Sequence, residues 1–223
     1  PMSQKPVLNW IALTLVPGLG SKTLWQLVDH FGGMTPLLTA CMDGRIKTAN
    51  FRKSVLSVLA NPVHLREEAE SHLEKLKACG ATAICPDDEL YPELLKEIVN
   101  APPVLYLQGR MELLNSMCVA MVGSRAATGY GKRSAFVLAQ DLAAAGVTVV
   151  SGLALGIDSE AHSGALAAGG DTIGVLGCGL DVVYPRQNQA LYEGIRTRGL
   201  LVSEYLPGTR PEGFRFPARN RII

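Results

Sequence analysis

Short apolar runs alternate with helical patterns over the second half of the chain. The apolar run at 117–122 is long enough for one buried strand, and a glycine-containing turn follows it. A helical pattern then extends over about 130–145, and a second apolar run at 147–150 ends in a Ser-Gly pair at 151–152. Strand, turn, helix and strand make a βαβ unit, and this unit implies a parallel sheet.

The same alternation continues to the end of the chain and also precedes the central unit. We predict helices from about 157 to 168 and over 189–198, and strands at 81–85, 104–107, 172–176 and 200–203. Strands that alternate with helices are typical of an α/β fold with a mainly parallel sheet. The acidic residues at 87–89 have no partner at catalytic spacing, so we interpret them as a solvated loop.

The first third of the chain reads as all-helical. We predict helices at about 8–16, 21–31, 35–42, 51–60 and 62–79, with Ser21 as the N-cap of the second. A Pro-Gly-Leu-Gly turn at 17–20 separates the first two helices. That pattern fits a helix-hairpin-helix whose turn amides contact a nucleic-acid phosphate, but with only Lys22 nearby to add charge it fits better a hairpin that only packs. We therefore expect a helical domain over 1–80 and a sheet domain over 81–223.

Composition restricts the classes of function. The net charge is +1, so any basic site is a local patch. Such a patch lies at the end of the chain, where 186–223 holds seven arginines and three glutamates, a net charge of +4. No apolar run reaches the roughly 18 residues of a membrane span, and we expect no secretory signal. The five cysteines form no C-x-x-C pair, which favours reduced thiols in a cytoplasmic protein.

The turns that follow the predicted strands at 117–122 and 147–150 are the candidate ligand-binding site. Carboxyl ends of parallel strands meet at one sheet edge, so 123–125 and 151–152 are expected to lie together. The sequence lacks the dinucleotide pattern G-x-G-x-x-G, and Ala126 and Arg133 break the phosphate-loop pattern. An arginine at 125 beside the start of a helix still suits a phosphate. The alternative is that Arg125 makes a structural salt bridge.

Other reactive side chains have weaker patterns. Asp158 and His162 are four apart on a predicted helix but lack a third ligand, so we expect no metal, and we interpret Asp158 as a cap or a brace of the turn. Cys178 has no evident base and is expected to pack. Phe214 and Phe216 lie among arginines, which suits base stacking on single-stranded nucleic acid, although both rings could instead be core.

Several segments resemble the DNA-processing protein A family, also called DprA or Smf. They are MVGSRAATGYG (121–131), VVSGLALGIDSEAH (149–162), GDTIGVLGCGLDVVYPRQN (170–188), LVSEY (201–205) and FRFPARNRII (214–223). The resemblance implies an extended Rossmann-like sheet and an N-terminal SAM-like or helix-hairpin-helix domain. It also implies a non-enzymatic protein without a cofactor, which binds single-stranded DNA and helps to load RecA during natural transformation.

The resemblance also implies which residues contact DNA. The family's basic pocket is built by the glycine-serine-arginine turn, the loop after tyrosine-proline and the proline-alanine-arginine-asparagine-arginine string. On this sequence the expected DNA-binding residues are Gly123, Ser124, Arg125, Ser151, Gly152, Arg186, Asn188, Arg219, Asn220 and Arg221.

Two further expectations concern partners and an alternative. Family proteins are expected to be homodimers, and their sheet continues after the stretch that ends here at Ile223, so we expect a truncated sheet domain without the region that contacts RecA. The alternative function is a nucleoside-monophosphate-hydrolysing enzyme of a related Rossmann-like family. The glycine-rich P-G-G-x-G-T loop of such enzymes is absent from this sequence.

Overall fold

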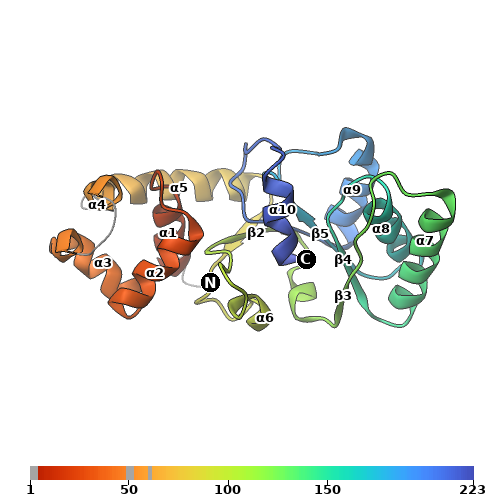
Figure 1. Ribbon diagram of the computed structural model, residues 1–223, viewed down its shortest axis with the longest axis horizontal. Helices are drawn as coiled ribbons and strands as arrows, with labels where there is room; N and C mark the ends of the chain where they lie inside the picture. Colours follow the sequence, from red (N-terminus) through yellow and green to blue (C-terminus); the bar gives the residue numbers. More distant parts are fainter. Residues whose placement is uncertain (1–4, 49–52, 60–61) are drawn as a thin grey trace. The chain divides into compact units, whose positions relative to one another are not determined.

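The computed structural model describes residues 5–48, 53–59 and 62–223, and Figure 1 shows its elements in chain order. These residues form two compact units. A helical unit contains the chain up to Ala78 together with 83–104, and a sheet unit contains 79–82 together with 105–223. Among the described residues, no helix is both long enough and apolar enough to cross a membrane.

The helical unit follows the predicted order of helices. Its elements are α1 (Lys5–Thr14), α2 (Ser21–Phe31), α3 (Met34–Met42), a 3-10 turn (Arg45–Thr48), α4 (Lys53–Leu59), α5 (Pro62–Ala78) and the short α6 (Glu93–Lys96). The predicted helix at 51–60 is confirmed over α4, and its residues 51, 52 and 60 lie outside the described residues. The predicted N-cap is wrong by one position. Gly20 caps α2 in an extended conformation, and Ser21 is already helical.

Most of the segment 83–104 clusters with the helices, which differs from the predicted boundary at residue 80, although its first residues also belong to strand β1 of the sheet. Two indoles hold this segment: Trp10 Nε1 donates to the Asp87 carboxylate and Trp25 Nε1 donates to the Ala101 carbonyl, both at 2.7 Å. Asp87 is exposed, which agrees with the interpretation of a solvated loop, and it also anchors the segment by accepting the hydrogen bond from Trp10. Neither bond is visible in the sequence, because the partners are more than 70 residues apart.

The sheet unit confirms the predicted mainly parallel α/β fold. Its strands are β1 (Thr82–Ile84), β2 (Leu105–Gly109), β3 (Cys118–Ala120), β4 (Thr148–Ser151), β5 (Thr172–Leu176) and β6 (Leu200–Ser203). The strand order is β1-β2-β6-β5-β4-β3. Strands β3 to β6 are parallel, and β2 is antiparallel to β6. The carboxyl ends of β3, β4, β5 and β6 therefore lie at one edge.

Three helices connect the parallel strands and lie next to one another (Figure 1). They are α7 (Gly129–Ala144), α8 (Ile157–Ala167) and α9 (Gln189–Arg198), as predicted within two residues. The remaining short elements are 3-10 turns at Met111–Asn115, Arg186–Asn188 and Asn220–Ile222, and α10 (Arg215–Arg219). Each connecting helix follows the loop at the carboxyl end of a strand, so these loops lie at the edge that carries the candidate site.

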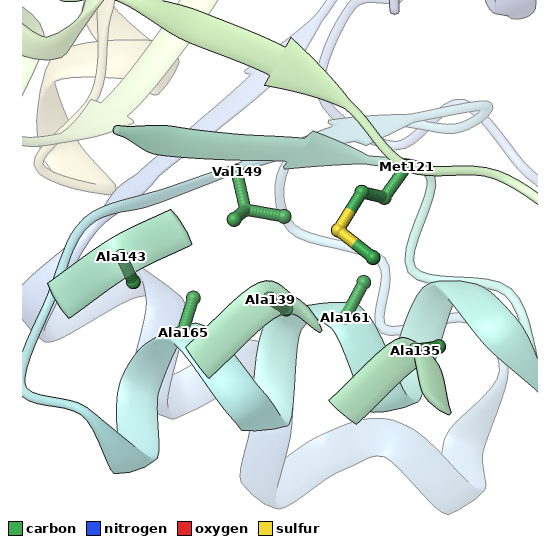
Figure 2. Packing of buried hydrophobic residues seen from close by; sticks show 7 residues of the cluster. All are labelled: Met121, Ala135, Ala139, Ala143, Val149, Ala161 and Ala165. Carbon is green, nitrogen blue, oxygen red and sulfur yellow. The ribbon is translucent and has the colours of Figure 1, made fainter. Parts of the chain in front are cut away.

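Small side chains let α7 and α8 pack closely under β3 and β4. Figure 2 shows the alanines of α7 at 135, 139 and 143 facing those of α8 at 161 and 165, with Met121 and Val149 above them. The i, i+4, i+8 spacing places the α7 alanines on one face of the helix. At Gly164 an added Cβ would clash with the Phe136 carbonyl oxygen, so a larger residue would force the helices apart.

The prediction of a buried strand at 117–122 is wrong. Residues 117–120 are all exposed, as is Val122, while Met121 alone is buried. The reason is the strand order, because β3 lies at the edge of the sheet within the described residues. An apolar run predicts a strand, but it does not predict which strands lie beside it and therefore whether it is buried.

Candidate nucleic-acid interface

The turn at 123–125 presents its residues to solvent after β3. Gly123, Ser124 and Arg125 are all exposed. The turn rests on the start of α8, where the Ile157 amide donates to the Ser124 carbonyl at 3.2 Å. Gly156 permits this contact, because its φ is +85° and an added Cβ would clash with the same carbonyl. The arginine is thus held outward by the backbone beneath it.

The first turn of α7 lies directly behind this arginine in the chain. Thr128 caps the helix by accepting from the Gly131 amide at 3.1 Å, and Ser124 Oγ accepts from the Ala126 amide at 3.2 Å. The predicted combination of an exposed arginine and a nearby helix start is therefore present. Such a combination favours anions, because the helix end carries partial positive charge.

Ser151 and Gly152, also predicted to contact DNA, are buried and support the first turn. Ser151 Oγ donates to the Met121 carbonyl at 2.6 Å and so ties the end of β4 to the end of β3. The Gly152 amide donates to the Asp158 carboxylate at 3.2 Å. The interpretation of Asp158 as a brace is confirmed, and burial raises the pKa of its carboxyl.

Arg219 lies inside this cluster. It is 3% exposed, and its guanidinium donates to the Gly152 carbonyl at 2.8 Å and to the Val175 carbonyl. Burial lowers the pKa of this guanidinium, the Asp158 carboxylate opposes that shift, and the charge of Arg125 adds to it. Arg219 therefore joins the ends of β4 and β5 from within, through its hydrogen bonds to two backbone carbonyls.

Two more predicted residues have structural partners. Asn188 is buried and its Nδ2 donates to the Leu153 carbonyl and to Ser159 Oγ, both at 2.8 Å. Arg221 makes a two-pronged ion pair with Glu204, with one nitrogen–oxygen distance of 2.8 Å. Asn220 is exposed, and its side-chain oxygen accepts from Arg219 Nε at 3.2 Å.

A cavity of about 150 Å³ lies beside the exposed turn. Its lining includes Gly123, Arg125, Asp158, Phe216 and Arg219. The structure thus brings the turn after β3 and the tail string together, as the sequence predicts, and the start of α8 also lines the cavity, whereas Arg186 does not. Two arginines and one carboxylate at this cavity leave it with an excess of positive charge.

An arginine and two rings form a row beside the cavity. The Arg125 guanidinium carbon lies 5.4 Å from the centre of the Phe216 ring. Phe216 in turn stacks on Tyr184, with ring centres 5.3 Å apart and planes 26° apart. Arg186 is exposed two residues after Tyr184. Tyr184 precedes the predicted loop residue Arg186 but was not itself predicted as a site residue, because only folding brings its ring to Phe216.

The remaining reactive groups are structural. Thr172 Oγ1 donates to the Val149 carbonyl at 2.7 Å, so the buried His162 must donate to Thr172 through Nδ1. Burial lowers the pKa of His162 to about 3. Burial raises the pKa of the Cys178 thiol to about 11, and this thiol donates to the Val182 carbonyl. Within the described residues, no group of three or more His, Cys, Asp or Glu could hold a metal ion.

Comparison with known proteins decides the family. The family model described as DNA recombination-mediator protein A matches residues 82–223, which include every predicted site residue. The chain belongs to this family. Protein Smf of Synechocystis sp. is 40% identical over 224 residues, which cover 96% of this chain and 54% of that protein. DNA processing protein DprA of Streptococcus pneumoniae is 48% identical over 136 residues, 61% of this chain and 48% of that protein.

Solved structures of family members agree with this assignment. The X-ray structure of DNA processing protein A from S. pneumoniae superposes with a TM-score of 0.72 at 33% identity, covering 96% of this chain and 73% of that one. The protein from Helicobacter pylori, described as having a unique single-stranded DNA binding mode, gives 0.56 at 35% identity, with 64% of each chain covered. The predicted resemblance is confirmed. The chain spans about half the length of the curated relatives it matches.

Proposed function

We propose that this chain binds single-stranded DNA as a recombination mediator, which protects incoming DNA and helps to load RecA during natural transformation. The observation that carries the proposal is the pair of exposed arginines at the carboxyl edge of the sheet. Within the described part of the chain, neither Arg125 nor Arg186 has an acidic partner at salt-bridge distance. Both charges are therefore available to phosphates.

The proposed mechanism is electrostatic. Arg125 and Arg186 neutralise phosphates of the strand and release bound counterions. Gly123 and Ser124 approach the DNA backbone closely at the exposed turn, and Asn220 lies at the rim of the same cavity. Ser151, Gly152, Asn188 and Arg219 act from beneath by holding the turns in place, and Arg221 does so through Glu204.

We also propose that the role is non-catalytic. The two side chains that could act as a base and a nucleophile already make structural hydrogen bonds. His162 donates to Thr172, and Cys178 donates to a backbone carbonyl. A buried histidine with a pKa of about 3 is too weak a base at pH 7, and a buried thiol that stays protonated is a poor nucleophile. These contacts support a binding site over a hydrolytic one.

Three finer statements belong to the same proposal. RecA is the protein partner, family-length proteins act as homodimers, and the protein works in the cytoplasm. The description of the family as a recombination mediator supports the first of these.

The proposal is tested by fluorescence anisotropy with a labelled oligo-dT and a matched duplex over a salt series. We expect wild type to prefer the single strand, with affinity falling as salt rises. The variant Arg125→Ala/Arg186→Ala should lower the slope of log K against log salt by about 1.4, because each lost phosphate contact on a single strand contributes about 0.7. Its affinity should fall at least tenfold, an order-of-magnitude expectation for two lost charge contacts.

A control arginine separates this effect from a general change in charge. Arg196 lies in the last turn of α9 and pairs with Glu193 at 2.7 Å, so Arg196→Ala should bind as wild type does. Equal affinity for duplex and single strand would contradict the proposal. So would a double variant that binds as tightly as wild type.

A further inference from the structure

Tyr184 stacks on one neighbouring ring and remains partly exposed. Its ring stacks on Phe216, yet the residue is 44% exposed, so Phe216 leaves part of it uncovered. The uncovered part of this ring can still stack against a planar group. Phe216 is itself half-buried, and Arg125 lies over its ring.

The underlying ring is positioned by the sheet. An added Cβ at Gly177, just after β5, would lie 2.8 Å from the Phe216 ring, so this ring lies directly against the strand end. Phe216 also belongs to α10, whose Arg219 is anchored to the ends of β4 and β5. Tyr184 therefore stacks on a support that is fixed from two directions.

We propose that the open face of Tyr184 is a stacking subsite for one nucleobase of the bound strand. The inference rests on the proposed function and adds to it a contact with the base rather than with the phosphate. The base would extend the row of Arg125, Phe216 and Tyr184 by one layer. Since the ring is already ordered by Phe216, binding a base costs little side-chain entropy.

The neighbouring arginine fits the same nucleotide. Arg186 is exposed two residues after Tyr184, so a phosphate next to the stacked base lies within reach of its charge. Every nucleobase has a π face, so the subsite accepts any of the four bases. A paired base has its faces covered by its neighbours in the duplex, and the subsite therefore favours single strands over duplex.

The test compares two oligomers of equal length, oligo-dT and an abasic deoxyribose-phosphate strand, by anisotropy with wild type, Tyr184→Leu and Tyr184→Phe. We expect wild type to bind oligo-dT about tenfold more tightly than the abasic strand, the size of effect that one stacked base produces. Tyr184→Leu should lose this preference and keep the wild-type salt slope. Tyr184→Phe keeps the ring and should retain the preference.

Tyr130→Leu is the matched control, because Tyr130 is an exposed tyrosine on the outer side of α7, beside Arg133 and Val137. It should leave the preference unchanged. The subsite is refuted if wild type binds oligo-dT and the abasic strand equally, or if Tyr184→Leu still prefers oligo-dT. Both results leave single-strand binding through Arg125 and Arg186 intact. Failure of wild type to bind either strand refutes the proposed function instead.

Discussion

Arginines at the sheet edge divide into two groups by their partners. Arg125 and Arg186 are exposed, whereas Arg219 is buried against backbone carbonyls and Arg221 is paired with Glu204. Residue type and sequence string assigned all four to DNA. The division depends on side chains that arrive from other elements, and for this reason no local pattern could supply it.

At this scale we predict that Arg219 positions the site without contacting DNA. Arg219→Lys keeps the charge but lacks the planar fork that reaches two carbonyls. Unfolding free energy should fall by roughly 2–4 kcal/mol, since hydrogen bonds from charged groups contribute about 1.5–3 kcal/mol each. Affinity for oligo-dT should weaken while the salt slope stays at the wild-type value. Urea denaturation and the anisotropy salt series measure the two quantities.

The slope of log K against log salt shows whether Arg219 contacts a DNA phosphate or only holds the neighbouring turns in place. Arg219→Gln removes the charge, and a slope reduced by about 0.7 with unchanged stability in that variant would show that Arg219 binds a phosphate after all. Arg125→Lys gives the opposite comparison, because its side chain is exposed and the charge is retained. That variant should leave both stability and slope close to wild type.

The positions of helices and strands along the chain were predicted better than their burial and their neighbours in the fold. The helices α7, α8 and α9 follow from helical periodicity between glycine-containing turns, and the strands β4 to β6 follow from short apolar runs. Burial of β3 was predicted wrongly because exposure depends on strand order, which is set by non-local pairing. The segment at 83–104 was misplaced for the same reason, since Trp10 and Trp25 capture it from far along the chain.

The packing of α7 on α8 yields a prediction about helix stability. Gly→Ala within a helix normally stabilises, by up to about 1 kcal/mol. At Gly164 the sign should reverse, because the added Cβ would clash with the Phe136 carbonyl oxygen. We expect Gly164→Ala to lower the unfolding free energy by about 1–3 kcal/mol, the usual cost of overpacking. Urea unfolding followed by far-ultraviolet circular dichroism measures this change.

Gly131→Ala is the matched control in α7. Its Cβ would meet Thr128 Oγ1 at 3.5 Å, an ordinary contact, so this variant should be neutral or stabilising. If Gly164→Ala also stabilises, the two helices have room to separate and the close packing is not required.

At the scale of the whole molecule, the sheet unit should lose stability in acid. The pKa of His162 is lowered by burial from 6.5 to about 3. Below pH 6.5 the unfolded chain therefore binds a proton that the folded unit does not, and stability falls as pH drops towards 3. The loss between pH 7 and pH 5 should be about 2 kcal/mol. The raised pKa of Asp158 acts in the opposite sense, and only near its own titration range.

Circular dichroism during urea unfolding at the two pH values tests this dependence. His162→Gln removes the titrating group and should flatten the difference, at a lower stability overall. His64→Gln, at an exposed position of α5, should behave as wild type. An unchanged pH dependence in His162→Gln would assign the acid loss to other groups.

The two tryptophans that anchor 83–104 determine what the intrinsic fluorescence of the protein reports. The chain contains two tryptophans, and both lie in the helical unit, with ring centres 5.1 Å apart. The sheet unit, which carries the proposed DNA site, contains none. Indole emission from the native protein is therefore a label on the helical unit alone. A shift in that emission when DNA is added would come from the helices around Trp10 and Trp25, and a silent spectrum alongside a full anisotropy change would place the whole binding event in the sheet unit.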